Sequence, residues 1–296
     1  MSAIPLVLCP IDLSPHSAVV VQHAGAVAEH FGASLLVVSV QDSGAGPGAL
    51  LESLVHDVLP HPTASRIEWQ WLGEGGPFAA PPILQLAHDR SADLIVMGGH
   101  GLSGFGARAA LGSTIGGVLA GTDIPTLVVP RLGARLETLR ELRHLGSVLA
   151  PTDFSALSRR DVRIGAGLAA AIGVPLLLLH VLPEVRGFHD SEQRWELRHA
   201  VARNALDALR RELHAPAVEL LVRCGAAGDE IAQVAAQKHA GLIVMGLRGV
   251  GGAHDSGAGS IATRVLCLAP TLMLTIPPAL ARRVGAAAVR ETAGQA

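Results

Sequence analysis

The sequence predicts an α/β protein made of two doubly wound, five-stranded parallel-sheet domains related by a pseudo-twofold axis. The first observation is length, because 296 residues make about two domains of common size. The second is alternation. Short, almost uninterrupted apolar runs are separated by Ala-rich helical stretches, which is typical of parallel sheets covered on both faces. The third is an internal repeat of about half the chain length.

The repeat is clearest where each half begins its first apolar run. Residues 4–13 read IPLVLCPIDL and residues 145–154 read LGSVLAPTDF, which aligns Asp12 with Asp153, 141 residues later. Further repeated motifs are LIVMG at 94–98 and 242–246, and IPTL and APTL at 124–127 and 269–272. Solenoid units repeat every ~20–50 residues, so this longer period indicates a duplicated domain.

We therefore expect a first domain at 1–132, a linker at 133–144, a second domain at 145–278 and a tail at 279–296. The expected strands of the first half are Leu6–Pro10, Ser34–Val40, Ile67–Leu72, Asp93–Met97 and Thr126–Val129. Those of the second half are Ser147–Ala150, Pro175–Leu182, Val218–Arg223, Gly241–Met245 and Thr271–Ile276. Expected helices at Ser17–Phe31 and Ala156–Ile172 each precede a glycine, Gly32 and Gly173, where a helix C-terminus needs a positive φ.

Composition excludes several functional classes. The net charge of −2 and the absence of Tyr argue against a nucleic-acid-binding surface, which needs basic groups and aromatic rings. The longest apolar run, Leu176–Leu182, is much shorter than the roughly 18 residues of a membrane span. Three cysteines in so long a chain are no disulfide framework, so we expect a cytoplasmic protein in a reducing compartment.

Two features of each half converge on one edge of its sheet. An aspartate, Asp12 or Asp153, directly follows the first strand, and a Gly-rich segment directly follows the fourth. Ligands of doubly wound folds bind beyond the carboxyl ends of the strands, where glycines expose backbone N–H groups to phosphate. In the second half, Gly259 and Ser260 also begin a helix at 261–268, whose N-terminus suits an anion. This layout predicts a nucleotide site, whereas glycines that serve only as turns and caps are the structural alternative.

These motifs resemble the universal stress protein family, with two such domains in one chain. The resemblance rests on Pro151-Thr-Asp-Phe-Ser155, on LIVMG at 242–246, on the glycine spacing Gly246, Gly249, Gly259-Ser260, and on APTLML at 269–274. It implies a cytoplasmic stress-response or regulatory protein that binds ATP or AMP, with or without Mg²⁺, and has no defined catalytic apparatus. It also implies that the two halves pair through their last strands.

Carried over residue by residue, the resemblance implies a nucleotide site in each half. The second-half site would comprise Asp153, Val181, Gly246, Gly249, Gly259 and Ser260. The first-half site would comprise Asp12, Val40, Gly98, Gly101, Gly112 and Ser113. Ten residues separate Gly101 from Gly112, against the family's nine, so spacing alone ranks the second site above the first.

Two other functions stay open from the sequence. One is a nucleotide-free module that binds a regulatory protein partner, and the other is a slow ATPase, for which His254 and Asp255 are the candidate groups. We expect no catalytic residue and no metal site, because the fourteen histidines lack metal-ligand spacing. Nucleic acid and membrane are not expected partners, and the oligomeric state should be a monomer or a homodimer of tandem chains.

Overall fold

The computed structural model describes residues 5–40, 48–59, 67–72, 79–99, 111–130, 145–184, 192–215, 217–247 and 259–280. Its contacts divide the chain into two compact units, built mainly from residues within 1–142 and within 143–274. The linker predicted at 133–144 lies outside the described residues, as does most of the tail. The predicted domain limits and the pairing of the two halves stay predictions, so each half is described by itself.

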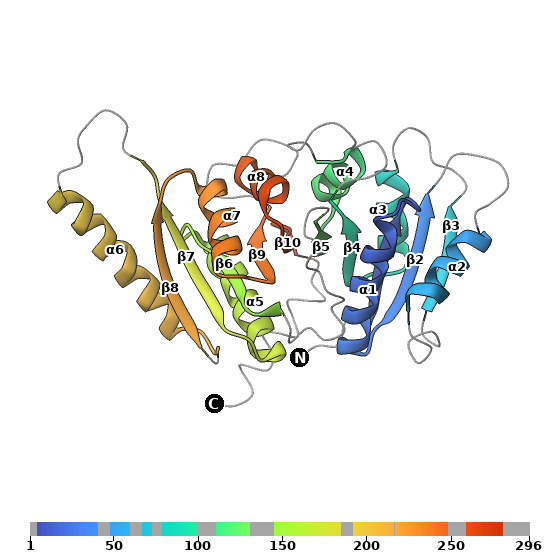
Figure 1. The fold of residues 1–296 in the computed structure, drawn as a ribbon, viewed down its shortest axis with the longest axis horizontal. Helices are drawn as coiled ribbons and strands as arrows, with labels where there is room; N and C mark the ends of the chain where they lie inside the picture. Colours follow the sequence, from blue (N-terminus) through green and yellow to red (C-terminus); the bar gives the residue numbers. More distant parts are fainter. Residues whose placement is uncertain are drawn as a thin grey trace. The chain divides into compact units, whose positions relative to one another are not determined.

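The first half alternates strands and helices throughout its length (Figure 1). Its elements are β1 (Leu6–Ile11), α1 (Ser17–Phe31), β2 (Ser34–Val40), α2 (Gly48–Val58), β3 (Ile67–Leu72), α3 (Ala80–Asp89), β4 (Leu94–Gly98), α4 (Ser113–Gly121) and β5 (Thr126–Val129). The strand order is β3-β2-β1-β4-β5, and all four neighbouring pairs are parallel.

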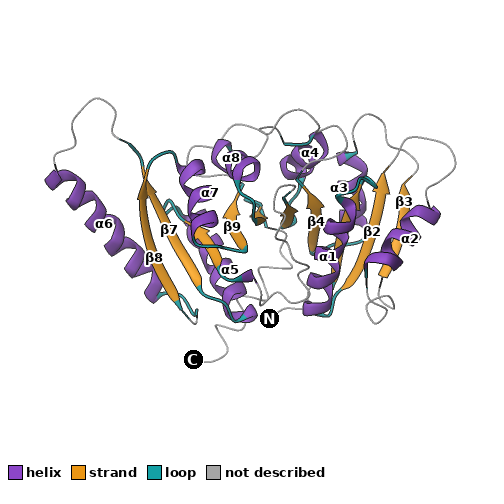
Figure 2. Ribbon diagram, viewed as in Figure 1, coloured by secondary structure: helices purple, strands orange, loops and turns teal. Residues whose placement is uncertain are grey.

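The second half repeats this succession of elements (Figure 2). They are β6 (Val148–Pro151), α5 (Ala156–Ile172), β7 (Leu176–Leu182), α6 (Glu192–Arg211), β8 (Val218–Cys224), α7 (Ala227–Gln237), β9 (Leu242–Gly246), α8 (Ser260–Leu268) and β10 (Leu272–Ile276). The strand order is β10-β9-β6-β7-β8, with β6 parallel to both β7 and β9. The predicted α/β class with two five-stranded halves is therefore confirmed.

The central strands form the core of each half because their sequences are apolar on both faces. Residues 7–11 of β1 are all buried, and the Cys9 thiol is completely inaccessible. Strand β3, at the edge of its sheet, is instead partly exposed, and Trp69 is 40% exposed. The predicted glycine caps are confirmed, since Gly32 and Gly173 end their helices with φ of 65° and 81°.

In both halves the first strand lies between the second and the fourth, so the chain reverses its winding direction beside that strand. This reversal opens a crevice beyond the carboxyl ends of the first and fourth strands, where ligands of doubly wound folds bind. No helix among the described residues combines the length and the apolar character that crossing a membrane requires.

Candidate functional site

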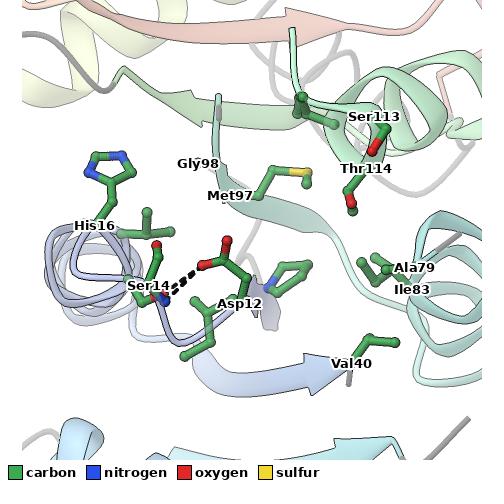
Figure 3. A pocket seen from close by; sticks show the side chains of 16 residues that line it. Asp12, Ser14, His16, Val40, Ala79, Ile83, Met97, Gly98, Ser113 and Thr114 are labelled. Atoms are coloured by element: carbon green, nitrogen blue, oxygen red, sulfur yellow. Dashed lines mark hydrogen bonds between the residues drawn. The ribbon is translucent and has the colours of Figure 1, made fainter. Parts of the chain in front are cut away.

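A cavity of about 260 Å³ lies at this crevice in the first half (Figure 3). Apolar side chains form much of its wall: Val20, Val40, Ile83, Met97 and Ile115. Polar groups line the rest: Asp12, Ser14, His16, Ser17, Ser113 and Thr114. An apolar slot with a few converging polar groups is the usual composition of a small-molecule site.

Asp12 is fixed at the end of β1 by the turn that follows it. One carboxylate oxygen, Oδ1, accepts the backbone N–H of Ser14 at 3.0 Å and the hydroxyl of Ser17 at 3.2 Å. The intervening residue, Leu13, has a φ of 57°, which a branched aliphatic residue rarely adopts. Backbone strain of this kind concentrates at functional sites, where the surrounding structure holds it. The turn thus keeps the Asp12 carboxylate at the cavity.

The N-terminus of α4 supplies backbone donors on the opposite side of the cavity. Gly112 is its N-cap and, as a glycine, provides no side chain to accept from the first turn of the helix. The first helical hydrogen bond runs from the N–H of Gly116 to the carbonyl of Gly112 at 3.0 Å. The N–H groups of Ser113, Thr114 and Ile115 therefore have no partner within the helix, and these three residues line the cavity. Such a helix end attracts anions.

The extra residue in the first half's glycine loop does not alter how the helix begins. Gly112 has φ and ψ of −59° and 147°, and its counterpart Gly259 has −59° and 154°. The described residues that flank each loop are also joined by equivalent bonds: the N–H of Gly112 donates to the carbonyl of Gly99 at 3.4 Å, and the N–H of Gly259 donates to the carbonyl of Leu247 at 2.6 Å. The two helix starts thus do not distinguish the halves, and the ranking by loop length stays a prediction.

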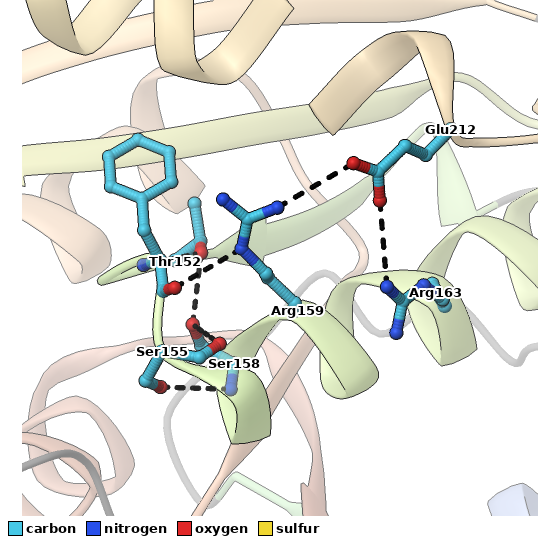
Figure 4. Close-up of polar contacts among 7 residues, drawn as sticks. Thr152, Ser155, Ser158, Arg159, Arg163 and Glu212 are labelled. Carbon is cyan, nitrogen blue, oxygen red and sulfur yellow. Dashed lines mark hydrogen bonds and ion pairs between the residues drawn. The ribbon is translucent and has the colours of Figure 1, made fainter. Parts of the chain in front are cut away.

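The second half reproduces the turn after the first strand. The N–H of Ser155 donates to Asp153 Oδ1 at 3.0 Å, and Phe154 has a φ of 64°. Additional contacts hold this turn (Figure 4): the Ser155 hydroxyl caps α5 by accepting the N–H of Ser158 at 3.1 Å. Arg159 Nε donates to the carbonyl of Phe154 at 3.2 Å, and its guanidinium also pairs with Glu212 at 3.6 Å.

A buried carboxylate distinguishes the second half. Asp161 on α5 is only 1% exposed, and one of its oxygens accepts Arg160 Nε at 3.0 Å and Nη2 at 2.9 Å. The backbone N–H of Gly246, at the end of β9, lies near this carboxylate and acts to lower its pKa. Burial raises the pKa of Asp161 to about 6, against the opposing effect of Arg160.

The structure brings together most of the residues that the sequence predicted for the first half. Those lining the cavity are Asp12, Val40, Gly98, Gly112 and Ser113. Their second-half counterparts take equivalent positions at strand ends and at the start of α8: Asp153, Val181, Gly246, Gly259 and Ser260. Gly101 and Gly249 lie outside the described residues, as do His254 and Asp255.

Other cavity residues were missed at the sequence level. Ala79 and Ile83 come from the start of α3, which carries no recognisable motif. Val20 lies in the first turn of α1, three residues after Ser17, so the helix start that follows Asp12 was a detectable signal for it. A second cavity of about 220 Å³ shares Ala79, Ser113 and Thr114 with the first, and therefore adjoins it along the start of α4.

The buried titratable groups near the core of the first half are not reactive. Burial raises the pKa of the Cys9 thiol far above its ordinary range, so the thiol is neutral and a poor nucleophile. Burial likewise lowers the pKa of His23, whose Nδ1 lies 2.7 Å from the carbonyl of Val19. Among the described residues, no three His, Cys, Asp or Glu side chains are grouped so as to hold a metal ion.

Fold and crevice together define a doubly wound α/β protein with an anion-attracting helix end at its switch point. The chain belongs to the universal stress protein family, whose sequence pattern matches residues 74–130 and 145–277. No curated protein sequence matches the chain significantly.

Solved structures match the whole chain at low identity. A protein of unknown function from Pseudomonas aeruginosa PAO1 matches with a TM-score of 0.69, 16% identity and 98% coverage of both chains. A universal stress protein from Archaeoglobus fulgidus DSM 4304 matches with a TM-score of 0.61 and 20% identity, covering 92% of this chain and 96% of its own. These likenesses show the fold alone. A universal stress protein solved in complex with cAMP is 24% identical, covers 45% of this chain and 97% of its own, and has a TM-score of 0.35.

Proposed function

We propose that this chain is a cytoplasmic stress-response or regulatory protein that binds an adenine nucleotide, ATP or AMP, in the first-half cavity. One observation carries the proposal: a fixed carboxylate, an apolar slot and an uncapped helix N-terminus converge on one cavity. The family resemblance supports the same ligand class. The three cysteines are free thiols, which supports a reducing compartment.

Each part of the cavity suits a different part of a nucleotide. The apolar side chains of Val40, Ile83 and Met97 suit the faces of a purine base. Asp12 accepts hydrogen bonds and therefore suits a ribose hydroxyl or the amino group of the base. The N–H groups that begin α4, together with the hydroxyls of Ser113 and Thr114, suit phosphate oxygens.

The second half is a proposed site of lower affinity. Its backbone frame at Asp153, Gly246, Gly259 and Ser260 is equivalent to the first half's, which supports some capacity for the same ligand. Its side chains differ, however, and Asp161 brings a buried carboxylate to the end of β9. We therefore rank the first half above the second, which reverses the order suggested by loop spacing.

The proposal includes binding and no chemical step. Cys9, a potential nucleophile near the cavity, is a buried neutral thiol. We infer that occupancy by nucleotide, with or without Mg²⁺, is itself the signal that a regulatory partner reads. ATPase activity and nucleotide-free partner binding are the alternatives that the experiment below distinguishes.

Calorimetric titration of the full chain with ATP and with AMP tests the proposal, with mass spectrometry of any nucleotide retained on purification. We expect binding to wild type, and Asp12→Ala should weaken it by about tenfold to a hundredfold, as expected for about 1–3 kcal/mol from an unmade hydrogen bond. The matched control, Asp153→Ala, should change the affinity much less. A chain that binds neither nucleotide overturns the proposal and favours the nucleotide-free module, whereas phosphate release during the titration favours the slow ATPase.

A further inference from the structure

Asp161 occupies a position that lines the cavity in the other half of the chain. Asp12 and Asp153 are 141 residues apart, and so are Gly32 and Gly173. The two halves therefore align without gaps from the end of the first strand to the end of the first helix. The same offset pairs Val20 with Asp161. Val20 forms part of the apolar cavity wall in the first half, so the second half has a carboxylate where the first has an aliphatic wall.

The Asp161 carboxylate already uses the donors around it. Arg160 donates two N–H groups to a single oxygen, at 3.0 and 2.9 Å. The backbone N–H of Gly246 lies near the carboxylate and acts to lower its pKa, and Gly246 is the first glycine of the proposed phosphate motif of the second half. The side chain of Asp161 is 2% exposed, so water screens its charge poorly. A poorly screened protein carboxylate thus lies beside the first glycine of the motif that would receive a ligand phosphate.

We propose that residue 20 and its counterpart 161 determine which half binds nucleotide: Val20 leaves the first half open to phosphate, and the Asp161 carboxylate weakens phosphate binding in the second, so that only the first half is filled in wild type. The inference rests on the proposed function. An ionised carboxylate repels phosphate strongly in a poorly hydrated site, because the effective dielectric constant there is low. Asp153 adds a second negative charge that interacts with Asp161. The burial that raises the pKa of Asp161 leaves it largely ionised at neutral pH.

Arg160 is the group that could act in the opposite sense, by attracting phosphate. Its side chain is 28% exposed, but two of its N–H groups are committed to Asp161. The cation of this pair is therefore partly hydrated and already engaged, whereas the carboxylate occupies the buried position that is apolar at Val20. An Arg160→Met variant tests this alternative directly, since it removes the cation and retains a side chain of similar length.

The experiment counts bound ATP and AMP per full-length chain by native mass spectrometry, with affinities from calorimetry. We expect one nucleotide on wild type and two on Asp161→Val, with unchanged affinity at the first site. Asp161→Asn, which keeps the shape and removes the charge, gives the same gain if the valine variant does not fold. The reciprocal double variant Val19→Arg/Val20→Asp copies the Arg160–Asp161 pair into the first half and should weaken its binding at least about tenfold.

Several outcomes overturn the inference. Two nucleotides on wild type, with one lost in Arg160→Met, would show that the second half binds phosphate through Arg160. A single nucleotide on folded Asp161→Val and Asp161→Asn would show that Asp161 is not the determinant. The proposed function fails separately: if wild type binds none while Asp161→Val binds one, the role of Asp161 stands, whereas the first-half site and the role of Val20 do not. If neither binds, both fail.

Discussion

The two halves of this chain share one backbone design and differ in the side chains that their equivalent positions present. Both have a strained residue after the first-strand aspartate, Leu13 or Phe154, and both begin their fourth helix at a glycine with nearly the same dihedral angles. The side chains around that frame differ. The comparison indicates that the shared backbone geometry forms a potential site in each half, and that a few side chains determine whether a ligand can bind there.

Two serines at equivalent positions, Ser17 and Ser158, illustrate this difference. In the first half the Ser17 hydroxyl donates to the Asp12 carboxylate at 3.2 Å and helps fix it. In the second half the equivalent Ser158 hydroxyl lies 3.0 Å from the hydroxyl of Thr152. Thr152 stands where the first half has Ile11, so a polar residue beneath the turn redirects the hydrogen bond. The aspartates of the two halves are therefore held by different sets of contacts.

Filling the first-half cavity should produce the largest difference in nucleotide affinity between equivalent variants of the two halves. Ala79, at the start of α3, lines the cavity, so Ala79→Phe puts a ring into the space that we assign to the nucleotide. We expect the affinity for ATP and AMP to fall more than about a hundredfold, which equals about 2.7 kcal/mol or more. Ala226, the N-cap of α7, is the matched control, because it is exposed at the equivalent place in the second half. Equal losses in Ala79→Phe and Ala226→Phe, measured by calorimetry, would contradict the assignment.

The start of the fourth strand is a second point of difference, and it concerns stability. A Cβ on Gly241 would collide with the carbonyl oxygen of Leu145 and lie 2.6 Å from the Cα of that residue. The first half has Asp93 there, and its Oδ2 accepts the N–H of Leu6 at 3.2 Å. Gly241→Asp should therefore cost about 3 kcal/mol, as overpacking against backbone does. Asp93→Gly should cost about 1 kcal/mol for one lost hydrogen bond. Urea unfolding measures both, and equal costs would refute the comparison.

The buried carboxylate predicts a pH dependence that the first half lacks. Asp161 has a folded pKa of about 6 and an ordinary value of 3.8, so the folded state binds the proton more tightly than the unfolded state. Its contribution to the free energy of unfolding is present below pH ~4 and is lost as the pH rises through about 6. Asp161→Asn removes this loss. The free energy of unfolding of the variant, relative to that of wild type, should therefore rise by up to about 3 kcal/mol between pH 4 and pH 7. Urea unfolding across that range checks the trend, and a constant difference would contradict it.

Much of this structure could be predicted from the sequence because the signals were local. Apolar runs marked strands to within a residue or two, and Gly32 and Gly173 marked helix ends through their conformational freedom. The motif residues Asp12, Gly98 and Gly112 do line one cavity. Ala79 and Ile83 could not be foreseen, since only the packing of α3 brings them to the crevice. Loop spacing ranked the second half first, and that ranking stays a prediction, because residues 100–110 and 248–258 lie outside the described residues and the N-caps Gly112 and Gly259 have nearly the same dihedral angles.

Helix capping gives the smallest expected difference between the halves. The Ser155 hydroxyl caps α5 through the N–H of Ser158, whereas no side chain caps α1. Ser155→Ala should therefore cost about 1 kcal/mol of stability. The equivalent Ser14→Ala keeps the backbone N–H that donates to Asp12, so it should cost less than about 0.5 kcal/mol. Thermal unfolding of the two variants compares them, and a larger loss in Ser14→Ala would contradict this account of the two turns.

The central claim is that nucleotide binds at the first-half crevice, and photolabelling tests it most directly. An azidoadenine analogue of ATP, irradiated with the full chain and competed with unlabelled ATP, identifies the contacted residues by peptide mapping. Our account predicts that the label that unlabelled ATP prevents is found on first-half peptides that contain the apolar cavity residues Val40, Ile83 or Met97. Competed label on second-half peptides that contain Asp153 or Val181, with none on the first half, would contradict it.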